Sequence, residues 1–235
     1  LGPELRRLAP DVPIYANFGA AQLRQWDGVA MARRAVEMIA ADALIIHLNP
    51  LQEAVQSGGD SNWTGIRHAI AELCRECEFP IICKEVGAGI SGQVARQLLE
   101  AGVAAIDVAG LGGTSWAGVE AERATDVKHR QIADGFRTWG IPTATAIADV
   151  RAACPETPLI ASGGIRDGVD CAKAIRLGAD IVGLAAGVLP AAVEGPQALI
   201  SHLEVIVTQL RIACFCTGSA DLASLRSANL APSIR

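Results

Sequence analysis

Residues 81–89 have the sequence Ile-Ile-Cys-Lys-Glu-Val-Gly-Ala-Gly, an apolar run that ends in a glycine-rich tip. Two further runs share its character: LIIHL at 44–48 and AIDVAG at 105–110. Strands that are buried on both faces are continuously apolar rather than alternating. The three runs therefore predict strands of a parallel sheet that helices cover on its outer side.

Short strands and helices alternate along the whole chain. Each predicted strand is followed by Gly, Asn or Ser and then by a helix with apolar residues three to four apart. The strands are predicted at 12–16, 43–48, 81–86, 104–109, 159–161 and 181–184. The helices are predicted at 29–40, 63–77, 91–100, 144–153 and 169–177, with 110–143 as a loop that carries one or two helical pieces.

Repeated βα units give either a doubly wound sheet or a barrel. Glycine-rich tips after so many successive strands favour the barrel, whose site gathers strand ends on one face. We therefore predict an α/β fold, a (β/α)₈ barrel, as a single domain over residues 1–235. Six βα units are visible, so two leading strands are expected to be missing. Closing helices are predicted at 199–215 and 220–226, which suggests a complete C-terminal end.

Composition excludes several classes of protein. The net charge is −5, so no basic stripe neutralises phosphates, and we expect no nucleic-acid partner. No run approaches about 18 apolar residues, and the first ten residues lack a signal-peptide core. A soluble, cytoplasmic protein without a membrane partner is the expectation.

Seven cysteines, an odd number in apolar segments, indicate reduced thiols. The pairs Cys74–Cys77 and Cys214–Cys216 could be metal or redox pairs, but neither has a second pair at zinc-ligand spacing. We expect them to be small buried apolar side chains.

His47, Asn49, Gln52 and Glu53 crowd into seven residues, HLNPLQE, at the end of the second predicted strand. Each alone has a structural explanation, such as a turn at Asn49 or a helix N-terminal charge at Glu53. Their clustering where a barrel strand opens onto its catalytic face predicts a site.

Lys84 interrupts an apolar strand, so it must point into a polar mouth or be paired, because burying a lone ammonium is costly. A structural ion pair is the alternative to an anion-binding role.

Glycine-rich tips at 162–166 and 183–187 follow what would be strands seven and eight. Loops at those places form the recurrent phosphate site of such barrels. The tip at 107–116, DVAGLGGTSW, predicts a flexible ligand-contacting loop or a connection with Trp116 packed over the barrel.

Taken together, these motifs resemble the type 2 isopentenyl-diphosphate isomerases. HLNPLQE and GGTSWAGVE (residues 112–120) are specific to that family, whereas SGGIR (162–166) is shared with other flavin and nucleotide barrels. The resemblance also includes the matching segments at 16–20, 84–91, 139–143, 162–179 and 217–225. The sequence departs from the family at its start, where a basic segment and a flavin-binding strand with Met, Thr and Gly are absent.

The resemblance implies an enzyme that interconverts isopentenyl and dimethylallyl diphosphates with reduced FMN and Mg²⁺, NADPH serving as reductant. Gln52 would lie beside the substrate alkene as a catalytic group, with His47 and Asn49 in the same pocket, and Glu53 would bind the metal. FMN would be held by Asn17, Lys84, Thr114, Gly164, Ile165, Arg166, Ala185 and Ala186. The family also implies a homo-oligomer, a tetramer or an octamer.

Two other readings remain open from the residues. One is another FMN or nucleotide barrel of the glycolate-oxidase or IMP-dehydrogenase kind, although the His-Gly-x-Arg-Gln stretch and the loop cysteine of those enzymes are lacking. The other is a catalytically incomplete barrel that serves as an assembly subunit.

Overall fold

A computed structural model describes residues 2–25 and 27–230, and it contains one parallel sheet of six strands. The strands pair in chain order, from β1 to β6, without a reversal. A doubly wound sheet reverses its strand order near the middle, whereas a barrel adds each strand beside the previous one. The order therefore confirms the barrel-type α/β fold. The strands are β1 (Tyr15–Gly19), β2 (Ala43–Leu48), β3 (Ile81–Glu85), β4 (Ala105–Asp107), β5 (Leu159–Ala161) and β6 (Ile181–Val182).

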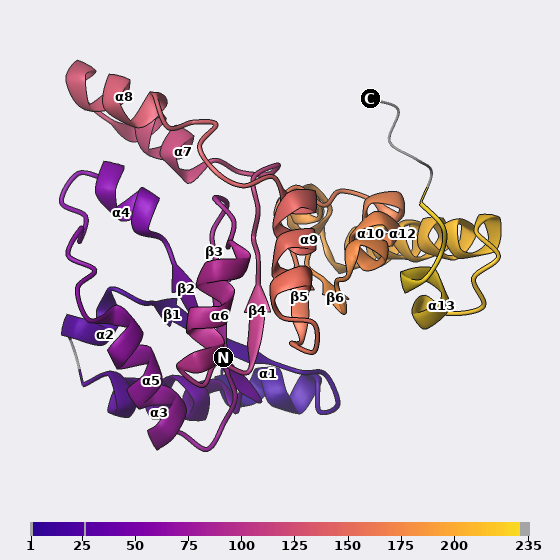
Figure 1. Cartoon of the computed structure of the whole chain (residues 1–235), viewed down its shortest axis with the longest axis horizontal. Helices are drawn as coiled ribbons and strands as arrows, with labels where there is room; N and C mark the ends of the chain where they lie inside the picture. Colours follow the sequence, from indigo (N-terminus) through magenta and orange to yellow (C-terminus); the bar gives the residue numbers. More distant parts are fainter. Residues whose placement is uncertain (1, 26, 231–235) are drawn as a thin grey trace.

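Helices cover the outer side of the sheet, and two of them, α7 and α8, stand beyond the carboxyl ends of the strands (Figure 1). The helices that follow strands are α3 (Gly28–Ile39), α5 (Ile66–Glu76), α6 (Gly92–Glu100), α9 (Thr143–Ala153) and α10 (Gly168–Leu177). The others are α1 (Gly2–Leu8), α2 (Gln22–Gln25), α4 (Pro50–Val55), α7 (Trp116–Arg123), α8 (Val127–Asp134), α11 (Leu189–Glu194), α12 (Pro196–Cys216) and α13 (Leu222–Arg226).

The two faces of the sheet bury different sets of side chains. Leu44, Ile46 and Ile106 point outward into the large core between sheet and helices. Ile82 and Ile160 belong to a smaller cluster that includes Ala43, Ala105 and Ile45. Because successive strand residues alternate sides, this second cluster fills the inner, lumen side of the sheet.

Most predicted elements are confirmed, but the first strand was placed three residues early. The prediction was 12–16, whereas β1 begins at Tyr15. Pro13 has no N–H to donate to a ladder, so regular pairing begins only after it. The amide of Ile14 instead donates to Asp42 Oδ2 (2.7 Å).

The HLNPLQE segment holds a helix that the predicted elements omit. Asn49 is the N-cap of α4 and Pro50 its first residue. Proline suits that position because its fixed φ matches the helix and its missing N–H would have no partner there. Gln52 and Glu53 therefore project from a helical turn rather than from a loop.

The cysteine prediction is confirmed in part. All seven thiols are free, and burial raises the pKa of Cys74 to about 11 and also raises that of Cys77, which keeps both protonated. Of the four cysteines predicted to be buried, Cys74, Cys77 and Cys214 are partly buried, whereas Cys216, at the C-terminal end of α12, is exposed.

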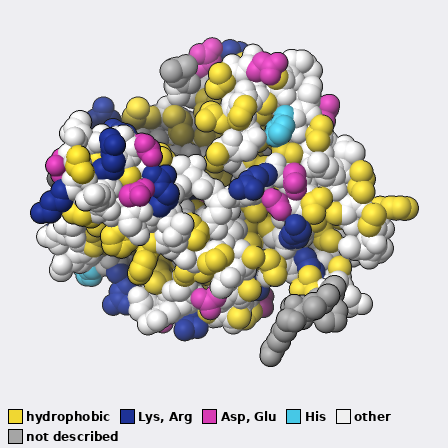
Figure 2. Space-filling model, turned by 90° about the horizontal axis from the view of Figure 1, so that it is seen from above, with side chains coloured by type: hydrophobic (Ala, Val, Ile, Leu, Met, Phe, Trp, Pro, Cys, Tyr) yellow, Lys and Arg dark blue, Asp and Glu magenta, His cyan; other side chains and the backbone are white. Residues whose placement is uncertain are grey.

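Helix α12 is long and apolar enough to cross a membrane by length and composition, which is weak evidence by itself. Here it packs against α10 and α11. Figure 2 views the molecule from the side of α7 and α8, and on this face basic side chains are interspersed with acidic and apolar ones rather than forming a stripe.

Candidate active site

The carboxyl ends of the strands carry a layer of polar side chains above the apolar lumen cluster. The sheet register pairs His47 with Lys84 and Lys84 with Asp107, so all three lie at one level and on one face. Asn17 joins them from β1, since its Oδ1 lies 2.8 Å from His47 Nδ1. On the far side, Ser162 donates to Asp107 Oδ1 (2.6 Å). Four neighbouring strands, together with Ser162 just after β5, thus supply one polar floor.

His47 is held in a defined state within this floor. Because Asn17 offers a carbonyl oxygen, Nδ1 of the neutral ring carries the proton and Nε2 keeps its lone pair. Burial lowers the pKa of His47, the Lys84 ammonium lowers it further, and Glu53 opposes both. The ring is therefore neutral at physiological pH.

Lys84 and Asp107 are the charged members of the floor. The Lys84 ammonium is half-buried and donates to the carbonyl of Glu85 (2.7 Å). Burial raises the pKa of Asp107, while the hydrogen bond from Ser162 and the charge of Lys84 oppose the rise. The Lys84 cation therefore favours the charged form of the buried Asp107 carboxyl.

A second network surrounds the first turn of α4. Asn49 is buried, and its Nδ2 donates to Glu53 Oε1 (2.9 Å) and to Gln52 Oε1 (3.3 Å). Gln52 Nε2 in turn donates to Glu120 Oε1 on α7 (3.4 Å). Glu120 is itself buried and lies 3.6 Å from the Arg123 guanidinium. Both ends of the Gln52 amide are thereby fixed.

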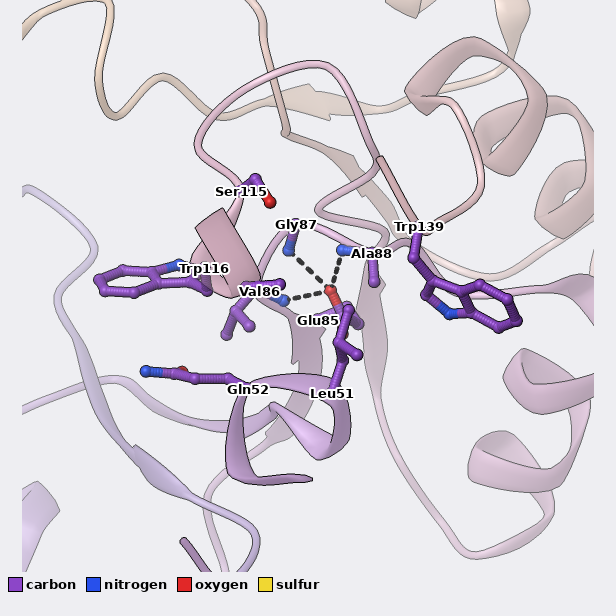
Figure 3. Close-up of a pocket in the computed structure, with 10 residues that line it drawn as sticks. Leu51, Gln52, Glu85, Val86, Gly87, Ala88, Ser115, Trp116 and Trp139 are labelled. Atoms are coloured by element: carbon purple, nitrogen blue, oxygen red, sulfur yellow. Dashed lines mark hydrogen bonds between the residues drawn. The ribbon is translucent and has the colours of Figure 1, made fainter. Parts of the chain in front are cut away.

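Figure 3 shows a small pocket between this network and the β3 loop, with a cavity volume of about 20 Å³. Gln52 and Leu51 line one side, and Glu85 with residues 86–88 lines the other. Ser115, Trp116, Ala117 and Trp139 complete the wall. The pocket therefore joins three predicted segments: HLNPLQE, KEVGAG and the GGTSW loop.

The two glycine-rich tips, for which a phosphate site is predicted, lie against each other. Gly187 after β6 is close enough to Ile165 and Arg166 that a Cβ on it would lie 3.3 Å from the Ile165 carbonyl oxygen. In this part of the described chain, the backbone amides of Gly164, Ile165, Arg166, Ala185 and Ala186 have no hydrogen-bond acceptor. Backbone N–H groups without an acceptor are available to bind an anion.

The tip after β5 also packs directly on the loop after β4. A Cβ on Gly164 would overlap the backbone of Gly112, and one on Gly113 would lie 2.8 Å from the Gly164 amide nitrogen. Gly164 has a φ of +76°, which favours glycine. Arg166 Nη2 reaches across to the Gly112 carbonyl (3.2 Å).

Thr114 is the predicted residue that the structure connects least to the others. Its side chain is exposed, and it is the carbonyl of Thr114 that faces the β3 loop, 2.8 Å from where a Cβ of Gly87 would lie. His47, Lys84 and Asn17 are brought together, as are Asn49, Gln52 and Glu53.

Four residues of the site received no role from sequence reasoning. Glu85, Asp107, Glu120 and Ser162 all lie within motifs that were singled out. Glu85 accepts the amides of the next three residues, whereas Asp107, Glu120 and Ser162 have partners elsewhere in the chain. Asp107 and Ser162 are 55 positions apart, and Gln52 and Glu120 are 68 apart. The available signal was the presence of an acid in an apolar run, because a buried carboxylate requires donors.

Comparison with known proteins agrees with this geometry. Residues 23–232 match the family model of the FMN-dependent dehydrogenases. The isopentenyl-diphosphate delta-isomerase of Stutzerimonas stutzeri (strain A1501) is 66% identical over 97% of this chain and 66% of its own length. That of Xanthobacter autotrophicus (strain ATCC BAA-1158 / Py2) is 59% identical over 98% of this chain and 67% of its own. The chain thus spans about two thirds of the length of these curated relatives.

Among solved structures, a mandelate oxidase mutant with an FMN adduct superposes with a TM-score of 0.66 at 19% identity, over 94% of this chain and 64% of the other. That likeness concerns the fold alone. The match to the family model and the identity to the curated relatives decide the grouping: the chain belongs to the FMN-dependent dehydrogenase family and, within it, to the isopentenyl-diphosphate delta-isomerases.

Proposed function

We propose that the chain isomerises isopentenyl diphosphate to dimethylallyl diphosphate, using reduced FMN and Mg²⁺, with NADPH as the reductant. The observation that carries the proposal is the position of the Gln52 amide, which Asn49 and Glu120 hold at one wall of the pocket. The opposite wall consists of residues 85–88, which directly follow Lys84 in the chain. The curated relatives, at 59–66% identity, bear the name of this isomerase.

The residues at the barrel mouth fit FMN. The free amides of 164–166 and 185–186 suit its phosphate, since oriented N–H groups and a following helix favour an anion. Lys84 has a half-buried ammonium that donates to one backbone carbonyl and retains donors for an anionic ring. Asn17 contacts His47, the neighbour of Lys84 in the register. Thr114 would have to turn its side chain inward to join them.

The residues also fit Mg²⁺, but only in part. Mg²⁺ binds oxygen ligands and is commonly held by one or two carboxylates together with substrate phosphates. Glu53 is such a carboxylate, and Asn49 Oδ1 is a buried oxygen without a hydrogen-bond partner among the described residues. In those residues no group of three or more His, Cys, Asp or Glu forms a complete metal cage. The diphosphate would supply the remaining ligands.

The reaction adds a proton to one carbon of the alkene and removes one from another. Reduced FMN, when bound, supplies electron density that stabilises positive charge at the alkene. Gln52 orients the alkene and relays a proton at its amide, which Asn49 and Glu120 hold in place. Neutral His47 keeps a lone pair at Nε2 that accepts a proton. Trp116 and Trp139 line the pocket and give part of its wall an apolar surface for the alkene.

The test is conversion of isopentenyl to dimethylallyl diphosphate by this chain with FMN, Mg²⁺ and NADPH, against reactions that lack FMN. Turnover that requires reduced flavin supports the proposal, and the Stutzerimonas relative serves as the positive control. Gln52→Ala should lower kcat at least a hundredfold, whereas Gln93→Ala, on the exposed face of α6, should not. Full turnover in Gln52→Ala would remove Gln52 from the mechanism.

A cytoplasmic location, a tetrameric or octameric assembly and a single-domain organisation belong to the same proposal. Sedimentation of the FMN-loaded protein gives the number of chains, and a monomer at micromolar concentration would contradict the assembly.

A further inference from the structure

Glu85 is a buried acid in the pocket wall to which the proposed reaction gives no part. It is 5% exposed and ends strand β3, directly after Lys84. Its Oε2 accepts the backbone amides of Val86 and Gly87 (2.6 Å each) and that of Ala88 (Figure 3). One carboxylate oxygen therefore gathers the N–H groups of three successive residues.

Successive amides that point to one spot form a concavity that binds anions. Here the concavity is occupied by a carboxylate of the same chain, so it is closed to a phosphate. Burial raises the pKa of Glu85, and the hydrogen bonds from the four amides of 86–89 oppose the rise. The Glu85 carboxylate thus occupies the place that an anionic ligand would take, and its hydrogen bonds hold the loop of residues 86–88.

The loop that Glu85 folds is also wedged between its neighbours. A Cβ on Gly87 would lie 2.8 Å from the Thr114 carbonyl, and one on Gly89 would lie 2.8 Å from the Ile141 carbonyl. Val86, Gly87 and Ala88 form the pocket wall opposite Gln52. The backbone carbonyl of Glu85 accepts the Lys84 ammonium. The residue therefore contacts the loop through its side chain and Lys84 through its backbone.

We propose that Glu85 is a positioning residue that holds residues 86–88 at the distance from Gln52 which the isomerisation requires. This inference rests on the proposed function. Glu85 acts through the loop and through the pocket that it shapes, and it transfers no proton itself.

Glu85→Gln keeps the shape of the side chain and removes its charge. Charge-assisted hydrogen bonds are roughly twice as strong as neutral ones, so we expect amide hydrogen exchange at 86–88 to accelerate about tenfold or more. Exchange in β4 and β5 should not change. Fluorescence from the pocket, which Trp116 and Trp139 line, should shift to the red. Glu100→Gln, at the exposed end of α6, is the matched control.

The kinetic expectation distinguishes positioning from simple loop stability. In Glu85→Gln, kcat should fall about tenfold or more while the FMN dissociation constant changes less than threefold, because the phosphate tips are untouched. Glu85→Asp keeps the charge but reaches fewer amides, so its exchange rates and kcat should lie between wild type and Glu85→Gln. Faster exchange with unchanged kcat and KM would overturn the positioning role.

Two measurements decide the inference even where a variant does not fold or the wild type lacks isomerase activity. In the wild type, the amides of 86–88 should exchange far more slowly than those of the exposed Gly112 and Gly113, and equal rates would overturn the proposal. A wild type without turnover refutes the proposed function, while exchange and fluorescence in the variants still test whether Glu85 shapes the pocket.

Discussion

His47 stands beside a fixed cation and within a largely buried floor, and both features act in the same direction on its charge. Burial lowers its pKa most, followed by the charge of Lys84. A neutral imidazole bonded to Asn17 through Nδ1 is then the resting form. At the scale of one residue, the surroundings rather than the residue type decide what the side chain does.

The lowered pKa of His47 predicts a pH dependence of stability. Below about pH 6.5 the unfolded chain takes up a proton on this histidine that the folded chain resists. The free energy of unfolding is therefore unaffected by His47 above that pH, and it decreases as the pH falls towards the lowered pKa of the folded state. Urea unfolding from pH 7.5 to 5.5 should show a steeper loss in wild type than in His47→Gln. Parallel profiles would contradict the assignment.

Lys84 predicts a dependence of flavin affinity on charge. Loss of a hydrogen bond to a charged group removes about 1.5–3 kcal/mol, so Lys84→Gln should weaken FMN binding about tenfold or more. Quenching of flavin fluorescence on titration measures the effect. Lys128→Gln, on the exposed surface of α8, provides the control. Equal FMN affinity in the wild type and both variants would exclude Lys84 from flavin binding.

The sequence was sufficient to predict most site residues that are neighbours in the chain. His47, Asn49, Gln52 and Glu53 crowd together in any local structure, and Lys84 in an apolar strand requires a polar mouth. The link from Gln52 to Glu120 was not predictable, because it depends on how α7 packs over α4, and no local pattern encodes that packing. The same holds for Asp107 and Ser162, which the sheet register brings together.

At the scale of elements, the glycine-rich loops after β4 and β5 are in backbone contact. The strands and most helices followed from the spacing of apolar residues, which is a local signal. The start of β1 and the short helix α4 did not, because proline sets both boundaries through its backbone and leaves the apolar pattern unchanged.

Gly164→Ala tests the backbone contact. The added Cβ would overlap the Gly112 backbone at a φ of +76°, so we expect a loss of about 2–4 kcal/mol in the free energy of unfolding. Gly58→Ala has a nearly equal φ of +74° with nothing within 4 Å, and should lose only about 1 kcal/mol. Chemical denaturation compares the two variants, and equal losses in the free energy of unfolding would mean that backbone strain at positive φ, rather than overlap with Gly112, causes the loss.

At the scale of the whole molecule, both edge strands of the described sheet pair on one side only, since β1 and β6 end the strand order. Helices α11 and α12, which follow β6 in the chain, carry exposed apolar side chains, including Val193 at 80% and Phe215 at 85% exposure. Exposed apolar patches of this kind mark interaction surfaces.

We expect this surface to cause self-association that depends on concentration. Burying a valine contributes about 1.5 kcal/mol or more, so Val193→Lys should weaken association about tenfold or more. Val127→Lys, at an exposed site on α8, is the control. Analytical ultracentrifugation gives both constants, and an unchanged constant for Val193→Lys would exclude this surface.

The glycine-on-glycine contact between the loops after β4 and β5 has a mechanical consequence. With no side chain between the two backbones, neither loop can move towards the other without displacing it. We therefore expect the loop that ends at Trp116 and the tip proposed for the flavin phosphate to move together. Cofactor loading would then be transmitted to the substrate pocket through main-chain contact, and the pocket would stiffen when the phosphate is bound.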